Sequence, residues 1–248
     1  MLTPAELPAL AGRDLRGTAC VVFDILRATS TFITALQNGA REIIPVSEIS
    51  EAVALRQSHP DALLAGERDG VRIRAGQSGG VDFDFGNSPR EFRADRVRGK
   101  TIASTTTNGT RALRACAGAN LVLASSFLNL AATASFLNQS PPDALLLVCA
   151  GTGEGAALED VLAAGALAGL VGGDYSDATE IAARAFLSAR ADLPAVMAGT
   201  QNARRLRAIP ELRADVAFCA QRDVFKIVAI MQAGGGLRPA LQGSEGRR

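Results

Sequence analysis

The sequence predicts an α/β fold of three layers, in which helices cover both faces of a mainly parallel or mixed central sheet. Two apolar runs, Thr18–Phe23 and Ala144–Cys149, are typical of strands that are buried on both faces. Helical segments separate these runs from further strands, and such alternation indicates a parallel sheet. The chain of 248 residues is long enough for one large domain, with a division into two subdomains near residue 140 as the alternative.

The first half of the chain is predicted to alternate strands with helices. The strands are expected at residues 18–23, 41–46, 62–66, 101–104 and 121–124. The helices are expected at residues 28–37, 47–58, 110–117 and 128–137. Asn38-Gly39 and Pro60 end the first two helices, because glycine and proline interrupt the helical conformation. Residues 70–87 are rich in glycine and are expected to form a long irregular loop, after which Ser88 and Pro89 begin a helix.

The second half of the chain begins with the strand at residues 144–149. Helices are predicted at residues 156–170 and 177–190, and over much of 198–209. Two short strands are expected at residues 215–219 and 224–230, and the tail from Gly234 is expected to be frayed.

The composition excludes several classes of protein. The net charge is +1 and the chain has one Tyr and no Trp, so neither nucleic acid nor a membrane surface is expected as a partner. No apolar run approaches the roughly 18 residues of a membrane span, and no secretory signal is visible at the start. Four cysteines without a C-x-x-C pair fit a reducing cytoplasm. A homo-oligomer is compatible with the sequence, since Gly165 and Gly169 allow close packing of helices within one chain or between chains.

Carboxylates follow several of the predicted strands. Asp24 and Glu67 each come at the end of a strand, and Glu159 and Asp160 begin the helix after residues 144–149. Ligands of α/β sheets bind at the carboxyl ends of strands, and carboxylate oxygens suit Mg²⁺. The alternative is structural: Asp24 caps the next helix, Glu67 pairs with Arg68 or Arg27, and Glu159 is a solvated charge.

A hydroxyl-rich loop follows the strand at residues 101–104. Its side chains and backbone amides favour binding of an anion, and they belong to Thr105, Thr106, Thr107, Asn108 and Gly109. Arg27 and Arg111, each near the start of a helix, are candidates to bind phosphate or a second acid group. The alternatives are a turn whose hydroxyls bind local backbone groups, and arginines that are merely solvated.

Other chemistries lack residues that they need. His59 is the only histidine, which excludes mechanisms that require two imidazoles. No Arg lies near Cys149 to activate a thiolate nucleophile. Residues 151–156 match a dinucleotide-binding glycine pattern, but no strand precedes the acid at Asp174 that should hold the ribose. A magnesium-assisted reaction on an anionic substrate remains.

Seven segments of the chain resemble the motifs of the 2-phosphosulfolactate phosphatases, the ComB family. They are residues 21–30 (VVFDILRATS), 66–68 (GER), 83–89 (FDFGNSP), 105–110 (TTTNGT), 126–129 (SFLN), 158–161 (LEDV) and 218–221 (FCAQ). The resemblance extends from about Val21 to Ile230. It implies a three-layer α/β/α fold and a Mg²⁺-dependent phosphatase that converts 2-phospho-3-sulfolactate to 3-sulfolactate and phosphate, a step toward coenzyme M.

The resemblance also covers most of the candidate site residues, and it adds Asn87 as a substrate-binding candidate. We assign the metal to Asp24 with Glu67 and one of Glu159 or Asp160, and catalytic roles to Asp24, Glu67 and Asp160. The nucleophile is then a metal-bound water, with direct attack by Asp24 as the less favoured route. The remaining alternative is a module that binds an anionic metabolite or a nucleotide without turnover.

Overall fold

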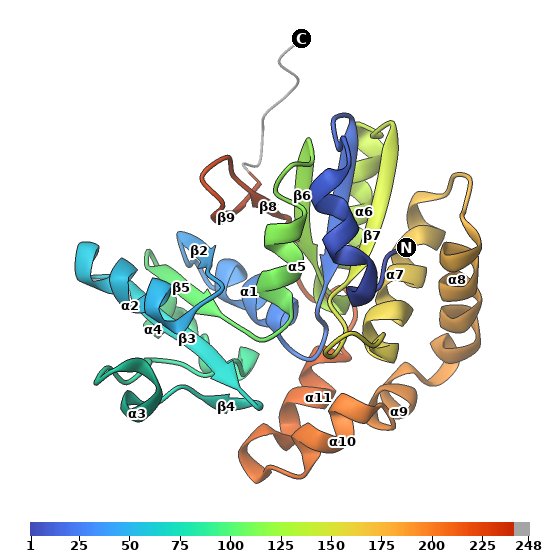
Figure 1. Cartoon of the computed structure of the whole chain (residues 1–248). Helices are drawn as coiled ribbons and strands as arrows, with labels where there is room; N and C mark the ends of the chain where they lie inside the picture. Colours follow the sequence, from blue (N-terminus) through green and yellow to red (C-terminus); the bar gives the residue numbers. More distant parts are fainter. Residues whose placement is uncertain (241–248) are drawn as a thin grey trace.

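The computed structural model describes residues 1–240 and shows one mixed sheet with helices on both sides (Figure 1). Its strands are β1 (Thr18–Phe23), β2 (Glu42–Pro45), β3 (Leu63–Arg68), β4 (Val71–Arg72), β5 (Thr101–Thr105), β6 (Leu121–Ser125), β7 (Ala144–Cys149), β8 (Ala229–Met231) and β9 (Leu237–Pro239). They lie in the order β4-β3-β5-β2-β9-β8-β6-β1-β7. The three-layer α/β prediction is therefore confirmed.

The helices connect these strands and extend beyond them toward the C-terminus. The α-helices are α1 (Ala28–Gln37), α2 (Ile49–Ser58), α3 (Ala75–Ser78), α4 (Ala94–Val97), α5 (Gly109–Ala115), α6 (Leu130–Gln139), α7 (Leu158–Val171), α8 (Asp177–Ala189), α9 (Leu193–Ala198), α10 (Gln201–Arg207) and α11 (Arg213–Cys219). Short 3-10 helices are η1 (Pro4–Gly12), η2 (Pro89–Glu91), η3 (Phe127–Asn129), η4 (Arg190–Asp192) and η5 (Pro210–Leu212). None of the helices described is both long and apolar enough to span a bilayer.

The sheet consists of two parallel groups that an antiparallel hairpin joins. β3, β5 and β2 are parallel to one another, as are β6, β1 and β7. β9 and β8 lie between the groups, and the pairs β2–β9, β9–β8 and β8–β6 are all antiparallel. Three reversals make the two groups run in opposite senses along the ladder. Figure 1 shows β2, β3 and β5 on the left, β6 and β7 farther to the right, and β8 and β9 between the two groups.

The twist of the sheet brings the carboxyl ends of the two groups together. Neighbouring strands rotate by roughly 20–25°, so the five steps from β1 to β5 amount to about 100–125°. β1 and β5 run in opposite senses along the ladder, but the twist makes their axes cross at a large angle. Asp24 after β1 therefore lines the same cavity as Glu67 in β3 and Thr106 after β5. The site depends on this twist as well as on the strand order.

The side chains of β1 enter two separate cores, as expected for a strand covered on both faces. Cys20 and Val22 pack with residues of α1 and α5, whereas Val21 and Phe23 pack with residues of α6 and α7. All six residues of β1 are buried. The four cysteines are free and buried.

The sequence prediction is confirmed for the three-layer order and wrong near the C-terminus. β1, α1 and β7 have the predicted bounds, and Asn38 caps the end of α1 before Gly39, which has a φ of 92°. Residues 215–219, predicted as a strand, lie in α11, where Asp215, Val216 and Cys219 form its buried face. A short and mostly apolar segment such as this one fits either structure.

The last segments also differ from the prediction. Of residues 224–230 only Ala229 and Ile230 are in a strand, because the earlier part follows η3, with Phe225 N–H donating to the carbonyl of Leu128. The tail from Gly234 was expected to be frayed, yet β9 pairs with both β8 and β2. The rest of that tail, residues 241–248, lies outside the described residues.

Candidate active site

A cavity of about 480 Å³ lies where the ends of β1, β3, β5 and β7 meet α10. Its walls combine carboxylates, hydroxyls, amides and two arginines with a few apolar side chains. The lining residues are Asp24, Leu26, Arg27, Glu67, Asp69, Gly70, Asn87, Thr106, Thr107, Asn108, Gly151, Thr152, Asn202, Arg205, Leu206 and Ile209. Seven of the twelve predicted site residues are in this set, and the other five are Thr105, Gly109, Arg111, Glu159 and Asp160.

Asp24 follows β1 directly and is buried at the wall of the cavity. Its Oδ1 accepts a hydrogen bond of 3.1 Å from the backbone N–H of Ala28, so the alternative in which Asp24 caps α1 holds for one oxygen. Its Oδ2 makes no hydrogen bond within residues 1–240. One carboxylate therefore both fixes the start of α1 and presents an oxygen for chemistry.

Burial is the main cause that raises the pKa of Asp24 to about 7, and the negative charges of Glu67 and Glu159 contribute to this shift. The Ala28 N–H and the charge of Arg27 act in the opposite direction. A carboxyl group whose pKa lies near neutrality can take up and release protons under ordinary conditions. Asp24 is thus suited to proton transfer.

Glu67 holds the hydroxyl-rich loop in place. Its Oε1 accepts hydrogen bonds of 3.0 Å from both the N–H and the hydroxyl of Thr107, and its Oε2 accepts one of 2.7 Å from the N–H of Gly70. The alternative pairing of Glu67 with Arg68 or Arg27 is not formed: Arg68 donates to the backbone carbonyl of Glu67 instead. Glu67 therefore ties the end of β3 to the loop after β5.

Asp160 connects the ends of two neighbouring strands. Its two oxygens accept hydrogen bonds from the backbone N–H groups of Ile25 (2.8 Å) and Gly151 (2.9 Å). Burial raises its pKa well above the usual value, and the charges of Asp24 and Glu159 add to this effect. Both oxygens are occupied by the backbone, so the contacts of Asp160 are those of a positioning residue.

Glu159 lies beside the cavity in the first turn of α7 and is buried, not solvated as the structural alternative supposed. Its Oε1 accepts a hydrogen bond of 2.7 Å from Asn202 Nδ2, and the same amide contacts Thr152 Oγ1 at 2.8 Å. Glu159 influences the pKa of Asp24, which places its charge near the same point.

The four carboxylates predicted as metal ligands gather at one end of the sheet but do not form a closed cage. Among residues 1–240 no group of three or more Asp, Glu, His or Cys side chains is arranged to hold a metal ion. Glu67 and Asp160 use their oxygens for backbone contacts. Asp24 and Glu159 each keep one oxygen without a hydrogen bond in the described chain.

Arg27 lines the cavity but is held by the protein. Its Nη1 lies 3.0 Å from Asp215 Oδ2 and its Nη2 donates to the carbonyl of Gly70 at 2.7 Å. Both partners of the Arg27–Asp215 ion pair are buried. Asn87 also lines the cavity, and its backbone carbonyl accepts a hydrogen bond from the hydroxyl of Thr31.

Only part of the hydroxyl-rich loop lines the cavity, and the rest contacts the surrounding backbone. Thr106, Thr107 and Asn108 line the cavity, while the Thr105 hydroxyl donates to the carbonyl of Ser47 outside it. Gly109 touches the site in another way, since a Cβ atom at this position would lie 2.7 Å from Asp24 Oδ2. The loop is therefore shaped both by its hydroxyls and by the absence of one side chain.

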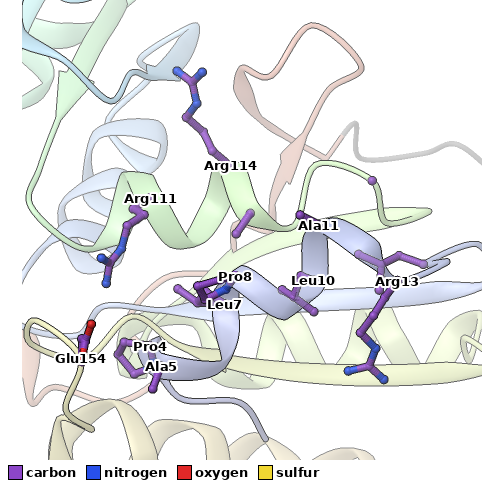
Figure 2. A pocket seen from close by; sticks show the side chains of 13 residues that line it. Pro4, Ala5, Leu7, Pro8, Leu10, Ala11, Arg13, Arg111, Arg114 and Glu154 are labelled. Carbon is purple, nitrogen blue, oxygen red and sulfur yellow. The ribbon is translucent and has the colours of Figure 1, made fainter.

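Arg111 is not brought to this cavity. It lines a second cavity of about 590 Å³ between η1 and α5, shown in Figure 2 with Arg13 and Arg114 at its edges. Its Nη2 donates to the carbonyl of Gly153 at 2.9 Å. A direct contact of Arg111 with a substrate at Asp24 is not supported by this position.

Sequence reasoning missed the contribution of the C-terminal helices. Asn202 and Arg205 of α10 line the cavity, and Asp215 of α11 braces Arg27. A helix was expected over much of residues 198–209, but no local signal connected it to the carboxylates. The only available hint was the number of polar and charged side chains in that segment.

The geometry is that of an α/β enzyme whose cavity holds a titratable carboxylate beside hydroxyl and amide groups. A model of the family 2-phosphosulpholactate phosphatase matches residues 2–234. The chain is an enzyme of the phosphoric monoester hydrolase class. Within that class it belongs to the 2-phosphosulfolactate phosphatase family.

Relatives of similar length support this assignment. A protein of Thermotoga petrophila, described as a probable 2-phosphosulfolactate phosphatase, is 40% identical over 215 residues, which cover 86% of this chain and 89% of the relative. Proteins with the same description from Caldanaerobacter subterraneus and Thermosynechococcus vestitus are 39% and 34% identical, over 90% and 91% of this chain and 91% and 92% of their own lengths.

Proposed function

We propose that this chain hydrolyses the phosphate ester of 2-phospho-3-sulfolactate, giving 3-sulfolactate and phosphate. The observation that carries the proposal is the buried carboxylate of Asp24, which has a pKa near 7 and lines a cavity together with Thr106, Thr107 and Asn108. The names of the relatives supply the substrate, and the cavity is large enough for a small phosphorylated acid.

Asp24 acts on a proton in this proposal. Its carboxylate accepts a proton from the attacking water, whose oxygen bonds to phosphorus as the bond from phosphorus to the ester oxygen breaks. The leaving alkoxide of sulfolactate takes up a proton from solvent water, so charge does not accumulate on the organic product. A group with a pKa near neutrality is well matched to such a transfer.

Mg²⁺ fits the cavity in the way proteins usually hold it, through one or two carboxylates with water and substrate phosphate completing its coordination. Glu159 is the residue that would hold it, since one of its oxygens has no hydrogen bond among residues 1–240, whereas the free oxygen of Asp24 is assigned to the proton. When bound, the ion neutralises charge on the phosphoryl group. Glu67 and Asp160 then position the loops around it.

The test is release of phosphate from a panel of phosphorylated hydroxy acids, with and without Mg²⁺, by the wild type and two variants. Asp24→Asn keeps the acceptor for Ala28 but cannot accept a proton, so turnover should fall by about 10²–10⁴-fold. Asp61→Asn, which changes an exposed aspartate outside the cavity, should be unchanged.

Two results would contradict the proposal. Wild-type turnover by Asp24→Asn would remove Asp24 from the reaction. Binding of 3-sulfolactate without phosphate release from any ester, with Mg²⁺ present, would instead identify a binding module.

A further inference from the structure

The walls of the active-site cavity carry more negative than positive groups. Among the lining side chains, Asp24, Glu67 and Asp69 are acidic, whereas only Arg27 and Arg205 are basic. A substrate with several negative charges is repelled by such a wall unless a cation is available to it. The two arginines differ in how far the protein itself compensates their charge.

The charge of Arg27 is already compensated inside the protein. Asp215 lies 3.0 Å from its Nη1, and both side chains are almost completely buried. The second terminal nitrogen donates to the carbonyl of Gly70. Asp215 in turn accepts a hydrogen bond of 2.7 Å from the hydroxyl of Ser88. Arg27 therefore serves first as a brace between α11 and the cavity wall.

Arg205 has no such compensation. It lies in the last turn of α10, its side chain is exposed, and within residues 1–240 it forms neither a side-chain hydrogen bond nor an ion pair. Arg204 and Arg207 on the same helix differ, because they donate to the carbonyls of Gly199 and Ala198 and do not line the cavity. Of these three cations, Arg205 is the one presented to the cavity.

We propose that Arg205 binds the acid group of the substrate that does not react, and so selects for substrates that carry one besides the phosphate. This inference rests on the proposed phosphatase function. Asp24 is buried and Arg205 is exposed, so an ester oriented toward Asp24 directs its far end toward α10. The planar guanidinium presents paired donors that suit a carboxylate or a sulfonate.

The experiment measures kcat/KM for three matched esters. 2-Phospho-3-sulfolactate has both acid groups, 2-phospholactate lacks the sulfonate, and isopropyl phosphate lacks both. In Arg205→Met, kcat/KM should fall about tenfold for each ester that carries the bound acid group, mainly through KM, as expected for one charge-assisted hydrogen bond. Isopropyl phosphate should stay within about twofold. A loss confined to the sulfonate ester identifies the sulfonate, and a loss shared with phospholactate identifies the carboxylate.

Arg207→Met is the control, because it removes a cation from the same helix outside the cavity. It should leave all three esters unchanged, and Arg205→Lys should recover part of the lost kcat/KM. Equal loss on isopropyl phosphate, equal loss in Arg207→Met, or no loss at all in Arg205→Met overturns the assignment.

A binding measurement separates this inference from the proposed function. Calorimetric titration with 3-sulfolactate needs no turnover, and affinity should be about tenfold weaker for Arg205→Met than for the wild type. If the wild type releases no phosphate but this difference remains, the phosphatase proposal fails and the role of Arg205 stands. If both proteins bind 3-sulfolactate equally, or neither binds it, the role of Arg205 is refuted.

Discussion

Gly109 leaves room for the carboxylate of Asp24. A Cβ atom on Gly109 would lie 2.7 Å from Asp24 Oδ2 and 2.6 Å from the Cβ of Ala28, which is closer than non-bonded atoms approach. The first residue of α5 can therefore lie against the end of β1 only as glycine. The position of the titratable carboxylate depends on a residue that has no functional group.

Gly109→Ala should lower both stability and activity. The added methyl group must push Asp24 or α5 away, at a cost of about 1–3 kcal/mol, typical of overpacking. Denaturant unfolding and phosphate release measure the two effects. Gly118→Ala is the control, because a Cβ atom there meets nothing within 4 Å. Equal stability and activity of the two variants would show that Asp24 and Ala28 can move away from the added methyl group without loss.

Asp24 should make the folded protein less stable as the pH rises. Its pKa is raised to about 7, above that of an unfolded aspartate, so the folded state binds the proton more tightly between about pH 4 and pH 7. Stability is lost as the pH increases through this window. In the absence of divalent ions, Asp24→Asn should match the wild-type Tm near pH 4 and exceed it by several degrees at pH 8. A lower Tm for Asp24→Asn at pH 8 would contradict the raised pKa.

Glu67→Gln should loosen two loops without unfolding the protein. The amide keeps one acceptor but places a donor against one of the N–H groups of Thr107 and Gly70. Hydrogen exchange should become about tenfold faster at whichever of these two amides loses its acceptor, the change expected for a loss near 1.4 kcal/mol. The exposed Glu211→Gln supplies the control. Unchanged exchange at both amides would show that Glu67 does not hold the loop.

Asp215→Asn should be strongly destabilising. It leaves the buried guanidinium of Arg27 without its counter-charge, and breaking a buried pair in this way costs about 3–5 kcal/mol. Urea unfolding measures the loss. Asp95→Asn breaks the exposed pair with Arg93 and should change stability by no more than about 1 kcal/mol. Similar losses in the two variants would mean that burial of the Arg27 pair has no energetic weight.

Local patterns were sufficient for much of the fold. β1, α1 and β7 have the bounds that their apolar runs and terminating residues predict. Burial on both faces of a strand and glycine at a helix end can each be recognised within a few consecutive residues. Residues 213–219 show where this fails. Their short pattern fits a strand or a helix, and the choice is made by Asp215 packing against a residue 188 positions earlier in the chain.

The linear pattern of residues was enough to predict that acids and hydroxyls follow buried strands, and hence that Asp24, Glu67 and the loop at residues 105–109 lie at one end of a sheet. The free carboxylate oxygens, the position of Arg111 at another cavity and the contribution of Arg205 from α10 could be read only from the folded chain. The physical reason is that burial follows the period of a strand or helix, whereas contacts between distant side chains depend on sheet twist and helix docking, which no local period records.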